Sequence, residues 1–471
     1  MGCRHTEVAG QIPGIRNRAT SWPALRRLIP TGLVLVFLLT GLESCRDSSR
    51  ISPPVTVTLL DPGWLDQEFS AWRSHEVQQF TRETGIQVKL LPAPETAVDQ
   101  LALWRKLLES DSDAPDVYAI DVIWPALLAD HFIDLKPFLS QETTADFPAL
   151  VTNDTVNGKL VALPYHADAG LLFYRTDLLQ EYGYHAPPAT WDELENMAAR
   201  IQAGERAKGK KDFWGFVWHG AAAEGLTCNA LEWQSSEGGG RIIEDDRTIS
   251  VNNPQAIRAW KRAARWVGSI SPPGVTAYLE WDALNIWRSG NAAFMRNWPA
   301  SYIVSRGEDS KVKDRFAGTL LPQGRDGHAD TLGGASLSVS RRSKHPQEAV
   351  ALVRYLCRRD VQLSRSLATS QPPTTLDLYD DAQVLRANPL FVQLKQVFLN
   401  GVVARPSTVT GKDYPRVSEA YFKAVHSVLT KERIAERAAA DLEAELVRIT
   451  GFKARPSLER ISPARDRKGR R

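Results

Sequence analysis

Apolar residues follow two different spacings in the first part of the chain. Runs rich in β-branched and other apolar residues predict strands at Val55–Leu60, Gln87–Leu91 and Pro115–Asp121. Between these runs, apolar positions at helical spacing predict amphipathic helices at Glu68–Glu83 and Thr96–Glu109. An order of strand, helix, strand, helix and strand is typical of a largely parallel sheet covered by helices. In such sheets, the loops at the carboxyl ends of the strands build the ligand site.

The rest of the chain continues to mix helical and strand patterns. Leu163 and Pro164 predict a turn before the polar residues His166 and Asp168. A short apolar strand is expected at Leu171–Tyr174, directly before a helix that opens with Thr176 and Asp177. Thr190, with Glu193 three residues on, forms a capping box, which predicts the start of another helix. Further strands are expected at Trp214–Trp218, Asn291–Asn297, Phe316–Leu321 and Ser336–Ser340, with a Gly-rich loop between the last two. Further helices are expected at Gly225–Ser236, Asn253–Ile270, Pro346–Leu367, Phe391–Leu399, Arg416–Leu429 and Glu432–Ile449. A mixed α/β pattern with several crossings suits two lobes that are joined by more than one strand.

Length and composition agree with a globular protein of at least two domains. At 471 residues the chain is too long for one ordinary core. Apolar residues make up 43% and charged residues 24%, which are near the averages of soluble folds, so a disordered body is not expected. The 14 tryptophans are many for a soluble protein. Their flat apolar rings suit stacking on sugar rings as well as core packing.

The formal net charge of +3 is unevenly distributed along the chain. Residues 1–44 carry about +3 and the tail from Lys453 carries about +6, so subtracting both from +3 leaves the body between them at about −6. An acidic body argues against a protein that binds nucleic acid. Residues 451–471 form a basic tail rich in Pro and Arg, which is expected to be disordered. This tail could lie in solvent or touch anionic lipid head groups.

The N-terminus carries the pattern of an export signal. Arg26 and Arg27 precede the apolar run Leu33–Leu39, which is too short for a comfortable transmembrane span. The run leads to Cys45, and the whole leader resembles a bacterial lipoprotein signal, although Glu43 stands where a small or apolar residue is usual. Residues 1–44 are therefore interpreted as a signal peptide of lipoprotein type, with Cys45 acylated. Simple cleavage and an uncleaved anchor are the alternatives.

Cysteines and histidines of the remaining chain suggest no metal or redox chemistry. Residues 45–52 are polar and short, as expected of a tether. Beyond them only Cys228 and Cys357 remain, and two separate buried thiols are the simpler interpretation, because spacing alone gives no pairing. The nine histidines are scattered, and no pair is spaced to ligate one ion. Neither a metal nor another cofactor is expected.

Residues that could bind a small polar molecule occur in four groups. They are Asp121 within Asp116–Trp124; His166 and Asp168 within Leu163–Leu179; Trp298 at the end of Ile286–Trp298; and the short motifs Leu332–Ala335 and Val403–Pro406. A carboxylate can accept hydrogen bonds from two vicinal hydroxyls at once. A Trp ring offers its negative face to the CH groups of a pyranose.

In order and spacing these groups resemble the sugar-binding solute receptors of ABC importers, with trehalose- and maltose-binding lipoproteins as the nearest likeness. The resemblance covers about residues 53–450. It implies an α/β, two-lobed periplasmic-binding-protein fold (type II-like), with hinged lobes around a central ligand cleft. Lobe 1 would comprise residues 53–164, with about 301–370 returning to it. Lobe 2 would comprise residues 165–300, with about 371–450 returning to it.

The resemblance also implies ligand contacts. Asp121 would hydrogen-bond sugar hydroxyls, although it could also cap a helix at Ile123–Ala129. Asp168 matches a ligand carboxylate of the family. His166 stands where an aromatic such as Tyr is usual, and it could instead be a satisfied core histidine. Trp298 would stack on a sugar ring, the alternative being a core Trp beneath the cleft.

Further ligand contacts follow from the same resemblance. Glu280 lies in a loop that trehalose receptors use for a carboxylate contact. Gly333 and Gly334 would let the backbone approach the ligand. Arg405 would grip hydroxyls with its planar fork, or else form a salt bridge at the rim. The first loop supplies the last two candidates, Asp66 and Glu68.

The function implied is that of a non-enzymatic, exported lipoprotein, expected to be a monomer. It would bind a disaccharide or related glucoside and deliver it to the permease subunits of an ABC importer, while its lipid anchor holds it at the membrane. Trehalose, maltose, sucrose and glucosylglycerol stay open, because His166 and Ala335 alter the expected pocket. The main alternative is an extracellular glycoside hydrolase, for which Asp121, Asp168 and Glu280 could imitate the carboxylate pair. A structural or adhesive lipoprotein would show no ligand-induced closure.

Overall fold

The computed structural model describes residues 54–61, 67–94, 97–110 and 115–456. Several sequence predictions lie outside these ranges: the signal peptide, Cys45, the tether, Asp66 and most of the basic tail. Glu68 lies in the first turn of helix α1 (Gln67–Thr84), but its side chain is not described. Within the described ranges, no helix is both long enough and apolar enough to cross a membrane.

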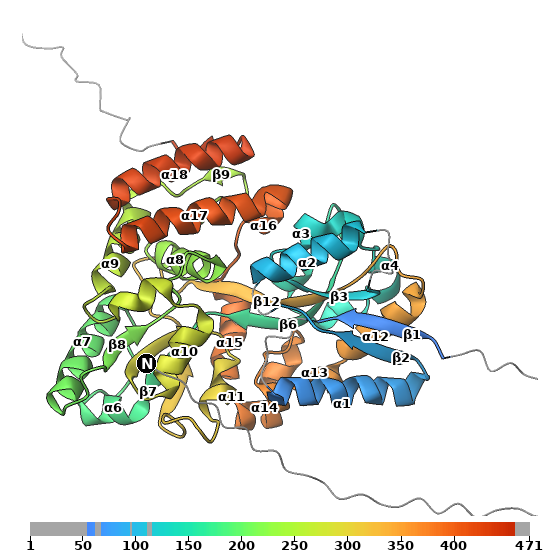
Figure 1. Cartoon of the computed structure of the whole chain (residues 1–471), viewed down its shortest axis with the longest axis horizontal. Helices are drawn as coiled ribbons and strands as arrows, with labels where there is room; N and C mark the ends of the chain where they lie inside the picture. The colour runs from blue at the N-terminus through green and yellow to red at the C-terminus, as the bar shows by residue number, and fades with distance from the viewer. Residues whose placement is uncertain (1–53, 62–66, 95–96, 111–114, 457–471) are drawn as a thin grey trace, which may run out of the picture. The chain divides into compact units, whose positions relative to one another are not determined.

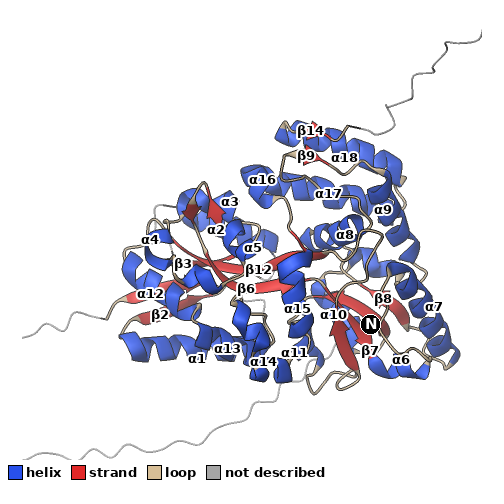
Figure 2. Cartoon of the chain, turned by 180° about the vertical axis from the view of Figure 1, so that it is seen from behind, coloured by secondary structure: helices blue, strands red, loops and turns tan. Residues whose placement is uncertain are grey.

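Strands from distant parts of the chain form the first sheet, which has six strands. Its order is β13 (Val402–Val403), β12 (Asp330–Val339), β3 (Val117–Asp121), β1 (Thr56–Leu60) and β2 (Gln87–Leu91), with β6 (Leu163–Ala169) paired to β12. β1 runs parallel to β2 and β3, whereas β12 runs antiparallel to β3 and β6. Figure 2 shows β12 and β6 side by side. The strand–helix alternation predicted for the start of the chain is confirmed.

Alternate residues of these strands face two different cores. Val57 and Val117 pack on one side, whereas Leu60 and Tyr118 pack on the other, as the two-residue period of a strand requires. The covering helices are α1 and α12 (Pro346–Leu356) on the first side and α2 (Ala97–Glu109) and α3 (Pro125–Leu128) on the second. Figure 1 shows α1 and α2 on opposite faces of the sheet. Helices therefore cover both faces of the sheet. Polar side chains of a ligand site are expected at the ends of its strands.

The second sheet has four strands. Its order is β11 (Phe316–Thr319), β7 (Leu171–Arg175), β10 (Ala292–Asn297) and β8 (Trp214–Val217). β10 is antiparallel to β7 and parallel to β8. The helices whose side chains share its hydrophobic cores are α7 (Trp191–Ala207), α8 (Glu224–Ser236), α9 (Pro254–Trp266), α10 (Glu280–Arg288) and α15 (Phe391–Gln396). Two further helices, α17 (Tyr414–Leu429) and α18 (Ala435–Thr450), extend one of these cores, with α17 packed on α8 and α9 and α18 packed on α17 and α9.

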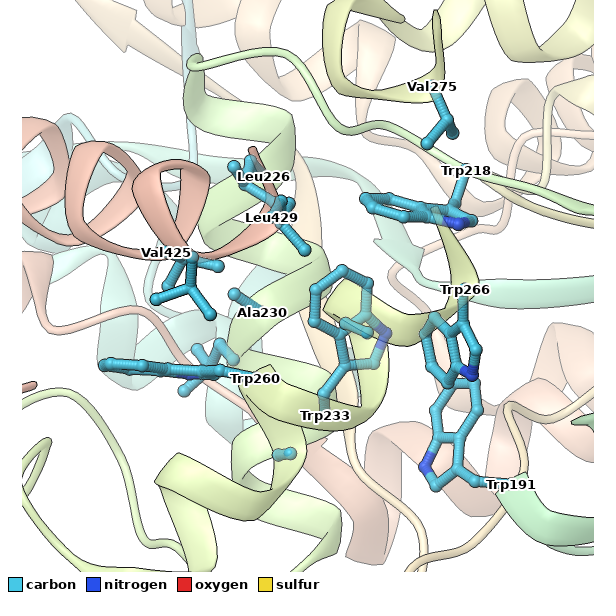
Figure 3. Close-up of a cluster of buried hydrophobic side chains, with 14 of the residues drawn as sticks. Trp191, Trp218, Leu226, Ala230, Trp233, Trp260, Trp266, Val275, Val425 and Leu429 are labelled. Atoms are coloured by element: carbon cyan, nitrogen blue, oxygen red, sulfur yellow. The ribbon is translucent and has the colours of Figure 1, made fainter. Parts of the chain in front are cut away.

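Tryptophans fill the core beside the second sheet. Trp191, Trp218, Trp233 and Trp266 pack against one another with ring centroids 5.0 to 6.4 Å apart (Figure 3). Most of the tryptophans in the described ranges are buried. The high Trp content therefore reflects core packing far more than ligand stacking.

Four elements differ from their sequence predictions. Leu163–Ala169 is a buried strand rather than a turn followed by polar groups. β12 begins at Asp330 and runs through the two glycines that were expected in a loop. A helix, α10, stands where the sequence suggested a loop around Glu280. The long helix expected at Pro346–Leu367 breaks at Cys357 into α12 and α13 (Arg359–Thr369).

Two predicted boundaries are wrong. β11 pairs with β7, so residues 316–319 belong to the second sheet, although the sequence assigned about 301–370 to the lobe of the first. The chain returns to the first sheet only with β12. The tail expected to be disordered from residue 451 instead begins with a strand, β14 (Lys453–Ala454), which pairs with β9 (Thr248–Ile249).

The remaining α-helices and strands are short. They are β4 (Thr155–Val156), β5 (Lys159–Leu160), α4 (Lys136–Leu139), α5 (Pro148–Asn153), α6 (Thr176–Glu181), α11 (Ser301–Ser305), α14 (Ala382–Ala387) and α16 (Ser407–Thr410). Cys228 and Cys357 are both free, the first buried and the second half-buried.

Candidate ligand-binding site

Neighbouring strands of the first sheet bring several predicted site residues together. In β12, Ala335 pairs with Asp121 of β3 on one side and with His166 of β6 on the other. Two residues earlier, Gly333 pairs with Asp168 of β6. Asp121 is the last residue of β3, so it stands at the carboxyl end of a strand, where α/β sheets usually build their ligand sites. The pairing of β12 with β3 and β6 therefore brings Asp121, His166 and Asp168 close together.

Both glycines of β12 are closely packed, and at Gly334 the packing and the backbone conformation together require glycine. Gly334 has a φ of +117°, and a Cβ there would overlap the carbonyl oxygen of His166. A Cβ at Gly333 would lie 3.0 Å from Cζ3 of Trp298 and 3.1 Å from Cβ of Asp168. Trp298 consequently places the edge of its ring against the backbone of β12, beside Asp168.

Arg405 connects the first sheet to α8. Its Nη1 donates to Oε1 of Glu224, the first residue of α8, at 2.9 Å, and its Nη2 donates to the carbonyl oxygen of Leu332 at 3.2 Å. Nη2 also lies 3.5 Å from Oδ1 of Asp121, which accepts the N–H of Ile123 at 3.1 Å. Asp121 therefore caps the turn after β3, and Arg405 forms salt bridges. Burial raises the pKa of Asp121, and the charge of Arg405 acts in the opposite direction.

Trp298 is half-buried just beyond β10 and has an arginine over its ring. The Cζ atom of Arg296 lies 4.1 Å from the ring centroid, and the same guanidinium pairs with Glu232, with Nε 3.0 Å from Oε2. Glu280, the first residue of α10, approaches Trp298 with a side chain that is 39% exposed. Its Oε1 lies 3.7 Å from Nδ1 of buried His219. Desolvation raises the pKa of Glu280, and Arg296 and Trp298 act in the opposite direction.

His166 and Asp168 carry buried polar atoms that no described residue satisfies. Nδ1 of His166 lies 3.6 Å from Oδ2 of Asp168, and neither this nitrogen nor Oδ1 of Asp168 has a hydrogen-bond partner in the described part of the chain. Burial raises the pKa of Asp168 to about 8, with Asp121 acting in the same direction, and burial lowers the pKa of His166 to about 3. At neutral pH the pair is a protonated carboxyl and a neutral imidazole. Such a pair can exchange hydrogen bonds with a neutral polar ligand.

Eight of the ten predicted ligand contacts thus form one connected group, and four further residues join it. The new members are Glu224, Arg296, Glu232 and His219. Glu224 is 181 residues from its partner Arg405, so no local pattern could reveal the pair. Arg296 stands two residues before Trp298, and strand alternation could have placed both side chains on one face.

Comparison with known proteins gives concordant matches. The family model of bacterial extracellular solute-binding proteins matches residues 76–391. The probable ABC transporter-binding protein of Deinococcus radiodurans is 47% identical over 374 residues, which cover 79% of this chain and 89% of that protein. Maltose-bound MalE3 of T. maritima superposes with a TM-score of 0.77 at 33% identity, over 83% of this chain and 99% of that chain.

A more distant structure supports the fold alone. The GacH receptor of Streptomyces glaucescens, solved unliganded and with acarbose, has a TM-score of 0.74 at 23% identity, over 85% of this chain and 99% of that chain. The family and fold class predicted from the sequence are confirmed, and the glycoside hydrolase alternative is not supported. The chain belongs to the bacterial extracellular solute-binding proteins of ABC transporters, a family of non-enzymatic receptors, and has their α/β periplasmic-binding-protein fold.

Proposed function

We propose that this receptor captures a disaccharide or related glucoside and hands it to the permease subunits of an ABC importer. The observation that carries the proposal is the setting of Trp298. Its half-buried ring is fixed on one side by Arg296 and stands beside Asp168 and the glycine backbone of β12. A pyranose ring can stack on the exposed part of the indole while its hydroxyls meet the carboxyl groups.

The hydrogen-bonding groups match a neutral, polyhydroxylated ligand. Each sugar hydroxyl can both donate and accept, and the site offers both kinds of partner. Protonated Asp168 can donate, and neutral His166 has a ring nitrogen without a described partner. Asp121, held by Arg405, can accept. The likeness to maltose-bound MalE3, at 33% identity, supports a carbohydrate as the ligand class.

Closure around the sugar is part of the proposal. The two sheets belong to two hinged lobes, and ligand bound between them favours the closed arrangement that the permease recognises. Trehalose, maltose, sucrose and glucosylglycerol are the candidate ligands. Acylation of Cys45 holds the monomeric receptor at the outer face of the membrane. Replacing Cys45 with Ser should abolish the incorporation of a labelled fatty acid into the expressed protein, and unchanged labelling would rule out acylation of Cys45.

Titration of residues 46–471 with these four sugars tests the ligand assignment. Isothermal calorimetry and tryptophan fluorescence should show saturable binding of one sugar with a Kd on the order of micromolar, the range in which a few stacking and hydrogen-bond contacts place affinities. Chromatography of the sugar after incubation should show no turnover. A well-folded protein that binds none of the four would reject the disaccharide assignment.

A further inference from the structure

A fully buried ion pair lies against the half-buried ring of Trp298. Arg296 and Glu232 are both 0% exposed. Nε of Arg296 donates to Oε2 at 3.0 Å, and Nη2 donates to Oε1, so the guanidinium and the carboxylate meet through two bonds. The bidentate geometry fixes the plane of the guanidinium. This guanidinium lies over the ring of Trp298, with Cζ 4.1 Å from the ring centroid.

The same pair lies against two of the segments of chain that pass between the two sheets. Oε1 of Glu232 accepts the N–H of Thr331 at 3.3 Å, at the start of β12, where the chain returns to the first sheet. Gly170 is the residue between β6 of the first sheet and β7 of the second. A Cβ on Gly170 would overlap Oε1 of Glu232 and lie 2.5 Å from Nη2 of Arg296. The ion pair therefore leaves room only for glycine at this passage.

We infer that Arg296 is the positioning residue for Trp298 and that Glu232 links it to the connecting segments at Gly170 and Thr331. Any shift of β12 relative to α8 strains the bond between Thr331 and Glu232. Because the carboxylate and guanidinium are joined by two bonds, that strain reaches the guanidinium that lies over the indole. The orientation of the stacking ring thus depends on how the two sheets are connected. The effect on sugar affinity rests on the proposed function, whereas the link itself exists without ligand.

Arg296→Lys tests the first step. Lysine keeps the charge but lacks the planar, bidentate fork. In the ligand-free protein the emission assigned to Trp298, obtained by subtracting the spectrum of the matching Trp298→Phe variant, should shift to longer wavelength. Affinity for the sugar should fall about tenfold, the effect expected of a desolvated cation–π contact. Unchanged emission and unchanged affinity in a folded variant would overturn the inference.

Arg206→Lys provides the matched control. Arg206 lies over Trp214 with Cζ 4.3 Å from the ring centroid, in nearly the same geometry. Trp214 pairs with Ala292, the first residue of β10, whereas Trp298 follows the last residue of that strand. The control loses an equivalent stack at the opposite end of the sheet and should keep wild-type sugar affinity. Equal weakening by both variants would mean a general stability effect and would overturn the positioning role.

Glu232→Gln tests whether the ion pair is linked to the connecting segments at Gly170 and Thr331. Hydrogen exchange of the Thr331 amide should become faster, and the Trp298 emission should shift as in Arg296→Lys. A pair that only stabilises the core would lower the free energy of unfolding and leave the emission unchanged, which would contradict the inference. The double change Glu232→Gln with Arg296→Met leaves no unpaired buried charge, so it should fold even if the single variants do not. If the wild type binds no sugar, the proposed function fails, while the emission and exchange measurements still decide this inference.

Discussion

Glu224 and Arg405 meet at 2.9 Å between Oε1 and Nη1, although 181 residues separate them along the chain. Glu224 opens α8, and Arg405 follows β13 at the edge of the first sheet. The same guanidinium lies 3.5 Å from Asp121. One buried cation therefore stands between two carboxylates that belong to different parts of the fold.

Removing this cation should destabilise the protein strongly. In Arg405→Met the carboxylates of Asp121 and Glu224 lose their shared partner, and the free energy of unfolding should fall by about 3 kcal/mol. Urea unfolding measures the change. Lys412→Met is the control, because its ion pair with Asp130 at 2.8 Å has side chains 75% and 73% exposed. The control should stay within about 0.5 kcal/mol of wild type. Similar losses in both variants would show that Arg405 does not balance the two carboxylates.

Gly334→Ala should be destabilising at the centre of the site. The φ of +117° is unfavourable for any L side chain, and the new methyl group would overlap the carbonyl oxygen of His166. We expect a loss of at least about 2 kcal/mol in the free energy of unfolding. Gly401→Ala serves as the comparison, because a Cβ at Gly401 meets nothing within 4 Å. A tolerated alanine at position 334 would mean that β12 can move away from β6.

The sequence predicted the start of the first sheet, from β1 to β3, well because its signals are local. The short β-rich runs and the helices between them appear in the structure at nearly the expected residues. Thr190 caps α7 as its spacing to Glu193 indicates, with Oγ1 accepting the N–H of Glu193 at 3.2 Å. Such features depend on residues a few positions apart, so one segment contains all the necessary information.

The parts that the sequence missed depend on distant partners. Leu163–Ala169 contains His166 and Asp168 and reads as a polar turn, yet pairing with β12 makes it a buried strand. The glycines of β12 read as a loop for the same reason. The arginine over Trp298 could have been inferred from strand alternation, but its carboxylate partner on α8, Glu232, is 64 residues away. Long-range pairs of this kind leave no local pattern.

Trp298→Ala should weaken sugar binding. Loss of the stacking face and of buried apolar area should cost about 2 kcal/mol of binding free energy, or roughly 30-fold in Kd. Calorimetry with the sugar that the wild type binds gives the value. Trp214→Ala removes another half-buried indole beneath an arginine, at the other end of the second sheet, and should leave Kd unchanged. An unchanged Kd for Trp298→Ala would remove Trp298 from the binding site.

Asp168 should make stability fall as the pH rises. Its pKa in the folded protein is raised to about 8, mainly by burial, from an ordinary value of 3.8. Between these values the folded state holds a proton that the unfolded state has released. The contribution of Asp168 is therefore fully present below about pH 4 and is lost as the pH rises toward 8, with a slope of at most about 1.4 kcal/mol per pH unit. An asparagine at this position does not titrate, so Asp168→Asn should gain stability relative to wild type across this range.

A second buried carboxyl, that of Asp154, distinguishes the contribution of Asp168 from the pH dependence that all other groups give to stability. Burial raises the pKa of Asp154 to about 7, so the relative gain of Asp154→Asn should level off near pH 7. The gain of Asp168→Asn should continue to about pH 8. Urea unfolding of both variants and the wild type, measured at half-unit steps from pH 4.5 to 8.5, distinguishes a gain that ends near pH 7 from one that ends near pH 8. Parallel curves for Asp168→Asn and wild type would mean that Asp168 is ionised in the folded protein at neutral pH. In that case the carboxyl would accept hydrogen bonds from the sugar and could not donate one, which would reverse its role in the proposed site.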